Sequence, residues 1–319
     1  MHEGGDVPSW QNNAGVNNGR VFGWTCTLVS ILPKRVSYAL GWLAMAIAHR
    51  RMAGVTQALV DNLRAVRPDA SPRELDRVAA ATYQSYARDV TDFLRSLSMA
   101  RADLDRLFVF RERERFDTAR ALGRGLILVT GHFGNWELGA VMMRHFGFPL
   151  DVVAMAEPDP LVNGIRRRMR ESLGVGTIEV RQSLDTALQI RRRLGENATV
   201  AMLMDRHLGR DRVRVTFFGR DAWFLRAPAL LGYLSGAPLV PCFIERQADG
   251  RFLVLPGVPI HVDRELPRDE AVRRAAQAFA SALEARIHER PDLWYQFYPY
   301  WRSQDAASAD HTKEMAWTG

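Results

Sequence analysis

Short, continuously apolar runs alternate with helical patterns over residues 125–290, and this alternation constrains the fold more than any other feature. Residues 125–130 form such a run bounded by glycines, which is typical of a strand buried on both faces. Strands that alternate with helices predict an α/β fold with a mostly parallel mixed sheet flanked by helices. Further strand-like runs lie at 150–155, 199–204, 213–218, 239–245 and 252–255, and helical patterns lie at 161–173, 183–194, 227–235 and 267–290.

Two apolar stretches, residues 21–32 and 36–48, precede this region and are separated by Pro33, Lys34 and Arg35. A helix over the second stretch rises about 20 Å, which is short of the roughly 30 Å hydrocarbon core of a bilayer. A single span through both stretches would place two adjacent cations near its centre. We therefore expect this region to be a helix that lies in, or partly enters, one leaflet, and a buried N-terminal helix of a soluble domain is the alternative.

The chain divides into four segments by composition. Residues 1–20 are rich in Gly and Asn and predict a disordered arm without a signal-peptide pattern. Residues 21–52 form the apolar membrane-associating region, residues 53–305 the α/β domain, and residues 306–319 a flexible tail. Within the domain, the capping-box pattern at 71–74 predicts the start of a helix.

A net charge of +7 and a pI near 9.9 indicate an anionic partner, such as nucleic acid, a phospholipid surface or an acidic carrier. The arginine clusters at 166–170, 191–193 and 206–214 contain no aromatic residue, which argues against nucleic acid. The two cysteines are far apart in the sequence, so no disulfide framework or CxxC metal knuckle is expected. We expect no metal site and no cofactor, because no zinc, phosphate-loop or dinucleotide motif occurs.

The motif Gly-His-Phe-Gly-Asn-Trp-Glu at 131–137 directly follows the first buried strand. With eight histidines and 36 acidic residues, a histidine followed by an acid five places later is expected by chance, so position must decide. The carboxyl end of a buried strand, in a turn that opens a helix, is where open α/β sheets bind ligands. There Glu137 would orient His132 and leave the second ring nitrogen free as a general base. A histidine that merely caps the turn is the alternative.

The chain resembles the glycerolipid (lysophospholipid) acyltransferase superfamily, whose His-x4-Asp/Glu motif is similar to residues 131–137. Within it, the chain most resembles the bacterial lipid A biosynthesis (late) acyltransferases and their glycolipid-modifying relatives. Arg206 departs from the Asp-Gln pair that usually stands at 205–206 in that family. The likeness runs over residues 33–302 and is carried in order by further blocks at 159–170, 203–206, 215–219, 236–241 and 290–302.

The resemblance implies that an acyl thioester, on acyl carrier protein or coenzyme A, donates its chain to a lipid hydroxyl. His132 would deprotonate that hydroxyl, Glu137 would orient His132, and backbone N–H groups around Gly134 would bind the oxyanion. The implied location is the cytoplasmic face of the bacterial inner membrane, as a peripheral or monotopic protein or with a single N-terminal anchor.

Five residues are the candidates for substrate binding. Arg168 lies in the block that resembles the family's arginine-bearing second block, so it would hold a phosphate or help to fix the donor. The alternative is that Arg168 lies on a helix face that points to water. Asp205, after an apolar strand, is a candidate for supporting the site or binding the acceptor, or else a turn cap. The set is completed by Gly134, Asn135 and Arg170. The aromatic residues over 294–301 would form an interfacial belt or pack over the sheet edge.

The leading prediction is an O-acyltransferase acting on a lipid A-like glycolipid at the inner-membrane surface, with no nucleic-acid partner. A phosphatidylinositol mannoside, another glycolipid or a lysophospholipid is the alternative acceptor. A basic membrane-surface binding protein without catalysis is the alternative of another class.

Overall fold

The computed structural model describes residues 19–96, 99, 101–180 and 184–305. Its helices are α1 (Gly19–Ile31), α2 (Lys34–Arg51), α3 (Ala53–Val66), α4 (Pro72–Ser96), α5 (Arg101–Leu107), α6 (Glu114–Ala121), α7 (Trp136–His145), α8 (Pro160–Ser172), α9 (Leu184–Gly195), α10 (Ala227–Ser235) and α11 (Arg268–Glu289), and the short 3-10 helix η3 (Pro291–Leu293). Its strands are β1 (Phe108–Phe110), β2 (Leu126–Thr130), β3 (Leu150–Ala154), β4 (Gly176–Glu179), β5 (Thr199–Leu203), β6 (Val213–Phe217), β7 (Arg220–Phe224), β8 (Leu239–Arg246) and β9 (Phe252–Pro256).

Seven strands form one sheet in the order β1-β9-β8-β2-β5-β3-β4. Every neighbouring pair is parallel except β8 and β9, and β6 and β7 make a separate antiparallel pair. The predicted α/β fold with a mostly parallel mixed sheet is therefore confirmed. The strands β1, β4 and β7 were not predicted: β1 has only three residues, and β4 and β7 mix polar with apolar residues.

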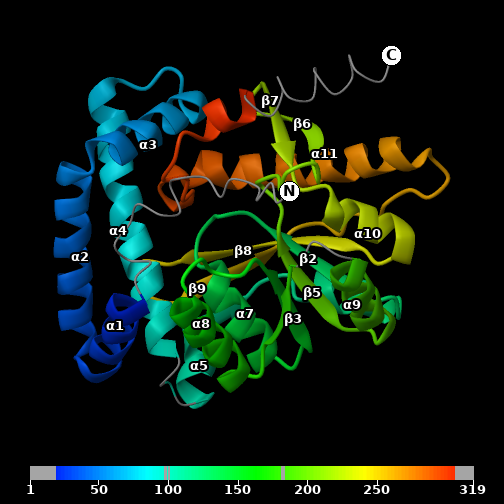
Figure 1. Cartoon of the computed structure of the whole chain (residues 1–319), viewed down its shortest axis with the longest axis horizontal. Helices are drawn as coiled ribbons and strands as arrows, with labels where there is room; N and C mark the ends of the chain where they lie inside the picture. The colour runs from blue at the N-terminus through cyan, green and yellow to red at the C-terminus, as the bar shows by residue number, and fades with distance from the viewer. Residues whose placement is uncertain (1–18, 97–98, 100, 181–183, 306–319) are drawn as a thin grey trace, which may run out of the picture.

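Helices cover both faces of the sheet (Figure 1), with α10 and α11 on one side and α7 and α8 on the other. The central strand β2 is buried throughout and supplies both cores by alternation. Ile127 and Val129 pack on the α10 and α11 side, and Leu126 and Leu128 pack on the α7 and α8 side. This double burial explains why β2 is a continuous apolar run rather than an alternating one.

The N-terminal helices stand beside the sheet, where α2 packs along the outside of α4 (Figure 1). The two apolar stretches form separate helices, since α1 ends at Ile31 and α2 begins at Lys34, directly after Pro33. The capping box also forms, since the Glu74 carboxylate accepts from the Ser71 backbone N–H at 2.8 Å and the Ser71 hydroxyl accepts from the Glu74 N–H at 3.4 Å. None of the helices in the described residues combines the length and the apolar character needed to cross a membrane.

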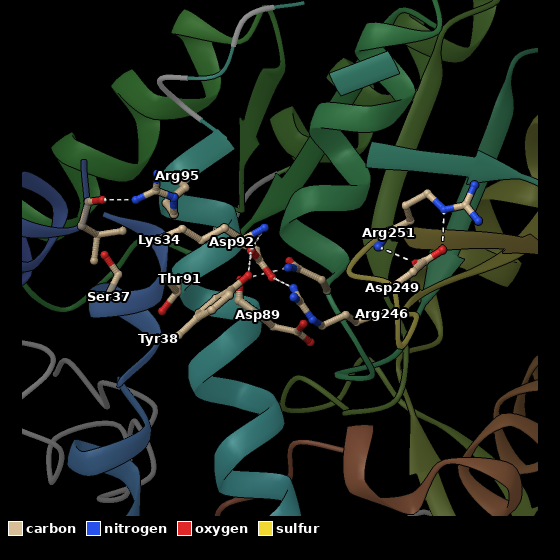
Figure 2. Close-up of polar contacts among 12 residues, drawn as sticks. Lys34, Ser37, Tyr38, Asp89, Thr91, Asp92, Arg95, Arg246, Asp249 and Arg251 are labelled. Carbon is tan, nitrogen blue, oxygen red and sulfur yellow. Dashed lines mark hydrogen bonds and ion pairs between the residues drawn. The ribbon is translucent and has the colours of Figure 1, made fainter. Parts of the chain in front are cut away.

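A buried carboxylate on α4 fastens α2 to the rest of the protein (Figure 2). The Asp92 side chain is 1% exposed and accepts from the Tyr38 hydroxyl of α2 and from the Arg246 guanidinium at the end of β8. Lys34, at the start of α2, lies 4.0 Å away. A buried carboxylate without such partners would be strongly unfavourable, so these contacts define how α2 sits on α4.

The predicted arm lies outside the described residues except for Gly19 and Arg20, which begin α1, and the predicted tail at 306–319 lies outside them altogether. The aromatic residues near the C-terminal end are interior. Trp294 and Tyr300 are fully buried and pack on each other and on Phe217. The predicted interfacial belt is therefore wrong, because these side chains belong to the hydrophobic core.

Candidate active site

The loop between β2 and α7 carries His132 and is shaped by Gly134. Gly134 has φ +59°, and a Cβ atom there would collide with the carbonyl oxygen of Ile244 on β8. Only glycine tolerates both the left-handed backbone and this close approach. The loop is therefore pressed against the sheet directly before the helix begins at Trp136.

His132 is paired with Asp205. Its Nδ1 atom lies 2.7 Å from Oδ1 of Asp205, and its backbone N–H donates to Oδ2 of the same carboxylate at 3.0 Å. The Asp205 side chain is fully buried, whereas the His132 side chain is 18% exposed. With Nδ1 engaged by the carboxylate, Nε2 is the nitrogen left to face a substrate.

The strand register explains this pairing. Strands β2 and β5 are parallel neighbours, and Thr130 at the end of β2 is opposite Leu203 at the end of β5. His132 and Asp205 each follow two residues after these partners, so the two side chains emerge together at the carboxyl edge of the sheet.

The electrostatics of the pair favour a neutral imidazole beside an ionised carboxylate. Burial lowers the pKa of His132, and the nearby Arg206 guanidinium lowers it further, although Asp205 acts in the opposite direction. Burial opposes ionisation of Asp205, but the charge and hydrogen bonds of His132, together with Arg206, lower the pKa of the carboxyl. A neutral imidazole is the form that can accept a proton.

Glu137 does not contact His132, in contrast to the expected pairing. Its Oε1 atom accepts from Arg170 at 2.9 Å and lies 3.4 Å from Arg166, both on α8. Because α7 begins at Trp136, Glu137 is already part of the helix and faces α8 rather than the loop. The two arginines lower the pKa of Glu137, although burial opposes this effect.

The backbone N–H groups proposed for an oxyanion are already occupied. Gly134 N–H donates to the Leu293 carbonyl at 2.9 Å, and Asn135 N–H donates to the Ile244 carbonyl at 3.1 Å. The Asn135 side chain caps α7 by accepting from the N–H of Leu138 at 3.1 Å. Gly134 and Asn135 therefore shape the loop, and their backbone donors are not directed at a substrate.

The two arginines predicted on α8 have different surroundings. Arg170 is committed to the Glu137 carboxylate. Arg168 is exposed and, within the described part of the chain, forms no hydrogen bond or ion pair. Arg168 and Arg170 are two residues apart on α8, so their side chains point in different directions. Arg166 and Arg170 are four residues apart and therefore share a face of the helix.

Residues 295–300, near the C-terminal end, hold His132 and Asp205 in place. No polar role was predicted for this segment from the sequence. The Gln296 amide donates to Asp205 Oδ2 at 2.8 Å, and Tyr295 N–H donates to the His132 carbonyl at 2.8 Å. The Tyr300 hydroxyl donates to the Asp205 carbonyl at 3.1 Å. A lone glutamine in an aromatic-rich run was the only local signal, and it did not identify its partner.

A pocket with a cavity volume of about 70 Å³ lies beside the loop and opens to solvent. Its polar lining residues are Asp89, Asn135, Glu137 and Arg166, and its apolar lining comes mainly from α4. The apolar and aromatic side chains that line it are Phe22, Tyr86, Val90, Phe93, Leu94, Trp136 and Tyr295. The residues that the structure describes contain no group of three His, Cys, Asp or Glu side chains arranged for a metal ion.

Comparison with known proteins adds the following likenesses. A sequence profile described as bacterial lipid A biosynthesis acyltransferase matches residues 21–303. The phosphatidylinositol mannoside acyltransferase of Mycolicibacterium smegmatis is 26% identical over 288 residues, which cover 89% of this chain and 90% of that protein. The protein of the same name from Mycobacterium tuberculosis, strain H37Rv, is 28% identical over 242 residues, 74% of this chain and 73% of the relative.

Proposed function

The chain belongs to the bacterial lipid A biosynthesis acyltransferase family, and from this membership we propose that it transfers a fatty acyl chain from an acyl thioester to a hydroxyl group of a glycolipid. It is thus a lipid acyltransferase. The observation that carries the proposed mechanism is the 2.7 Å contact between His132 Nδ1 and a buried Asp205 carboxylate. The arrangement supplies a base whose second nitrogen is free, without a protein nucleophile.

In the proposed reaction, Nε2 of His132 removes the proton from the acceptor hydroxyl while the oxygen attacks the thioester carbonyl carbon. The tetrahedral intermediate collapses to an ester, and the thiolate leaves with the proton returned from Nε2. Asp205 holds the tautomer with the proton on Nδ1 and stabilises the imidazolium between the two proton transfers. Base catalysis of this kind contributes about 10²–10⁴-fold.

The pocket beside the loop is the proposed site for the acyl chain, because its apolar walls suit hydrocarbon and its Trp136 wall touches His132. The two rings meet edge to face with centroids 5.4 Å apart. Arg168 remains the proposed phosphate contact for the donor, since its guanidinium is exposed and without a partner in the described residues. Glu137 would keep Arg166 in place at the pocket and Arg170 beside it.

A phosphatidylinositol mannoside is the acceptor we propose first, ahead of the lipid A-like acceptor expected from sequence alone. The support is that two relatives covered over 73–90% of their length carry that activity in their names. Coenzyme A and acyl carrier protein both remain donors to test.

The proposed location is a membrane surface, which the N-terminal helices would contact. Large apolar side chains of α1 and α2 are exposed, and the basic residues Arg35, Arg50 and Arg51 beside them suit an anionic leaflet. Trp24 is 70% exposed. The exposed set is Val21, Trp24, Leu28 and Ile31 in α1 and Val36, Leu40, Trp42, Leu43 and Ile47 in α2.

Sedimentation with vesicles tests this location. Binding to vesicles that contain phosphatidylglycerol should fall at least about tenfold in Trp24→Glu. A large apolar side chain that becomes buried in the bilayer contributes about 1.5–3 kcal/mol to the binding free energy. Leu234→Glu, at an exposed apolar position of α10, is the matched control and should bind as the wild type does. Equal binding by both variants would contradict the proposal.

The activity test uses radiolabelled palmitoyl-coenzyme A or palmitoyl carrier protein with three acceptors: a phosphatidylinositol mannoside, a lipid A precursor and a lysophospholipid. Transfer to the first, abolished in His132→Ala, is the expected result. His145→Ala is the matched control, since His145 also pairs with an aspartate at 2.7 Å (Asp105) but lies at the far end of α7. Loss of transfer in both variants, or in neither, would contradict the assigned role of His132.

A further inference from the structure

Helix α4 carries two buried aspartates one turn apart, and only one of them has a cationic partner (Figure 2). Asp92 is paired with Arg246 and with the Tyr38 hydroxyl. Asp89 is 6% exposed, and within the described residues no arginine, lysine or histidine forms an ion pair with it. Its Oδ2 atom accepts a hydrogen bond from the Tyr295 hydroxyl at 2.7 Å.

Asp89 is connected in two ways to the loop between β2 and α7, which carries His132. Its backbone carbonyl accepts from the Asn135 side chain at 2.9 Å, the same side chain that caps α7. Its carboxyl group binds Tyr295, whose N–H donates to the His132 carbonyl at 2.8 Å. Asp89 is therefore linked to His132 by hydrogen bonds through a single intervening residue, Tyr295.

The Asp89 carboxyl also lines the pocket beside the loop, next to Val90 and Phe93 of the same helix. A chain that fills this pocket displaces the water that would otherwise solvate an anion there. An ionised carboxylate against hydrocarbon is strongly unfavourable, whereas a protonated carboxyl is tolerated.

We propose that Asp89 is a positioning residue that must be protonated for the pocket to accept the acyl chain, so that donor binding takes up one proton. The inference rests on the proposed function, because it assumes that the occupant of the pocket is the acyl chain of the donor.

The surroundings of Asp89 favour the neutral form. Burial raises the pKa of Asp89 to about 7, against the effect of the Tyr295 hydrogen bond, which lowers it. Among the charges around it, Asp92 of α4 and Asp292 of η3 raise the pKa further, and Arg246 of β8 lowers it.

Two further charged groups line the same pocket, Glu137 of α7 and Arg166 of α8, and they face each other at 3.4 Å. They form an ion pair with no net charge. The nearby Tyr86 of α4 stays neutral because burial raises its pKa. The group that changes charge near neutral pH on this wall is thus Asp89.

The direction of the pH effect follows from these charges. Below pH 7 the carboxyl is neutral and the chain enters; above pH 7 a proton must be taken up first. The apparent KM for the donor should therefore rise about tenfold for each pH unit above 7. Asp89→Asn keeps an acceptor for the Tyr295 hydroxyl but cannot ionise, so its donor KM should stay flat.

The experiment measures KM for palmitoyl-coenzyme A from pH 6 to pH 9 in the wild type, Asp89→Asn and Glu245→Gln. Glu245 is the matched control, because it is also buried with a pKa raised by burial, but it pairs with Arg286 and does not line the pocket. Glu245→Gln should keep the wild-type rise in KM. An equal rise in the wild type and in Asp89→Asn would overturn the proposal.

A binding measurement separates this inference from the proposed function. Calorimetric titration of the wild type with a thioether analogue of palmitoyl-coenzyme A, in two buffers of different ionisation enthalpy at pH 8, should show uptake of about one proton more than Asp89→Asn. Active enzyme without this excess uptake would refute the role of Asp89 alone. Absence of transfer to every acceptor, with the uptake present, would refute the proposed function instead. Should Asp89→Asn fail to fold, absence of uptake in the wild type still overturns the inference.

Discussion

Replacing Asp205 with asparagine tests the central pair with a change of a single atom. The carboxylate receives three hydrogen bonds: the His132 backbone N–H and the Gln296 amide on Oδ2, and His132 Nδ1 on Oδ1. An asparagine oxygen can serve the first two from the Oδ2 position. Its NH₂ group then faces Nδ1, which must become an acceptor, so the proton of the imidazole moves to Nε2.

With Nε2 protonated, His132 can no longer remove a proton from the acceptor hydroxyl. The loss is the full contribution of the base, about 10²–10⁴-fold in kcat, or about 3–5 kcal/mol in the barrier. The donor KM should change little, because Asp205 is fully buried and does not line the pocket. Initial rates with radiolabelled donor measure both constants, and circular dichroism checks that the variant is folded.

Glu137→Gln is the matched comparison, because it retains an acceptor for Arg170 and removes only a charge. It should lower kcat by less than about tenfold, because the amide oxygen still accepts from Arg170 and the pairing of His132 with Asp205 is unchanged. The double variant with His132→Ala and Asp205→Asn should be no slower than His132→Ala, since residues that act as a unit are not additive. A drop of a hundredfold in Glu137→Gln, with Asp205→Asn near the wild type, would refute the pairing and restore the dyad expected from sequence.

Arg206→Gln should raise the pKa of His132, because Arg206 lowers it in the wild type; the acid limb of the kcat profile, which lies below the ordinary histidine value, should move to higher pH, and an unmoved limb would contradict this. Gly134→Ala should lower the free energy of unfolding by at least about 2 kcal/mol, through the left-handed backbone and the contact with Ile244, as measured by urea denaturation; unchanged stability would mean that the loop is not pressed against the sheet. Arg168→Ala should raise the donor KM about three- to tenfold with little effect on kcat if it holds a donor phosphate, and an unaltered KM would leave it as a solvated side chain.

Much of the fold was predictable from sequence because its signals are local. A strand buried on both faces, such as β2, must be apolar throughout, and the capping box at Ser71 and Glu74 is satisfied within one turn. The position of His132 at the carboxyl end of β2 followed from the same reasoning. The short strands β1 and β4 were missed because their pairing partners, rather than their composition, make them strands.

What the sequence determined by itself was the order of elements and the place of His132; what only the tertiary structure decided was the partner of His132. Along the chain the nearest acid is Glu137, but hydrogen bonds depend on distance in space, and α7 turns that side chain toward Arg170. The parallel register of β2 and β5 instead brings in Asp205, 73 residues away. Register and strand order arise from the packing of the whole sheet, and no local pattern encodes them.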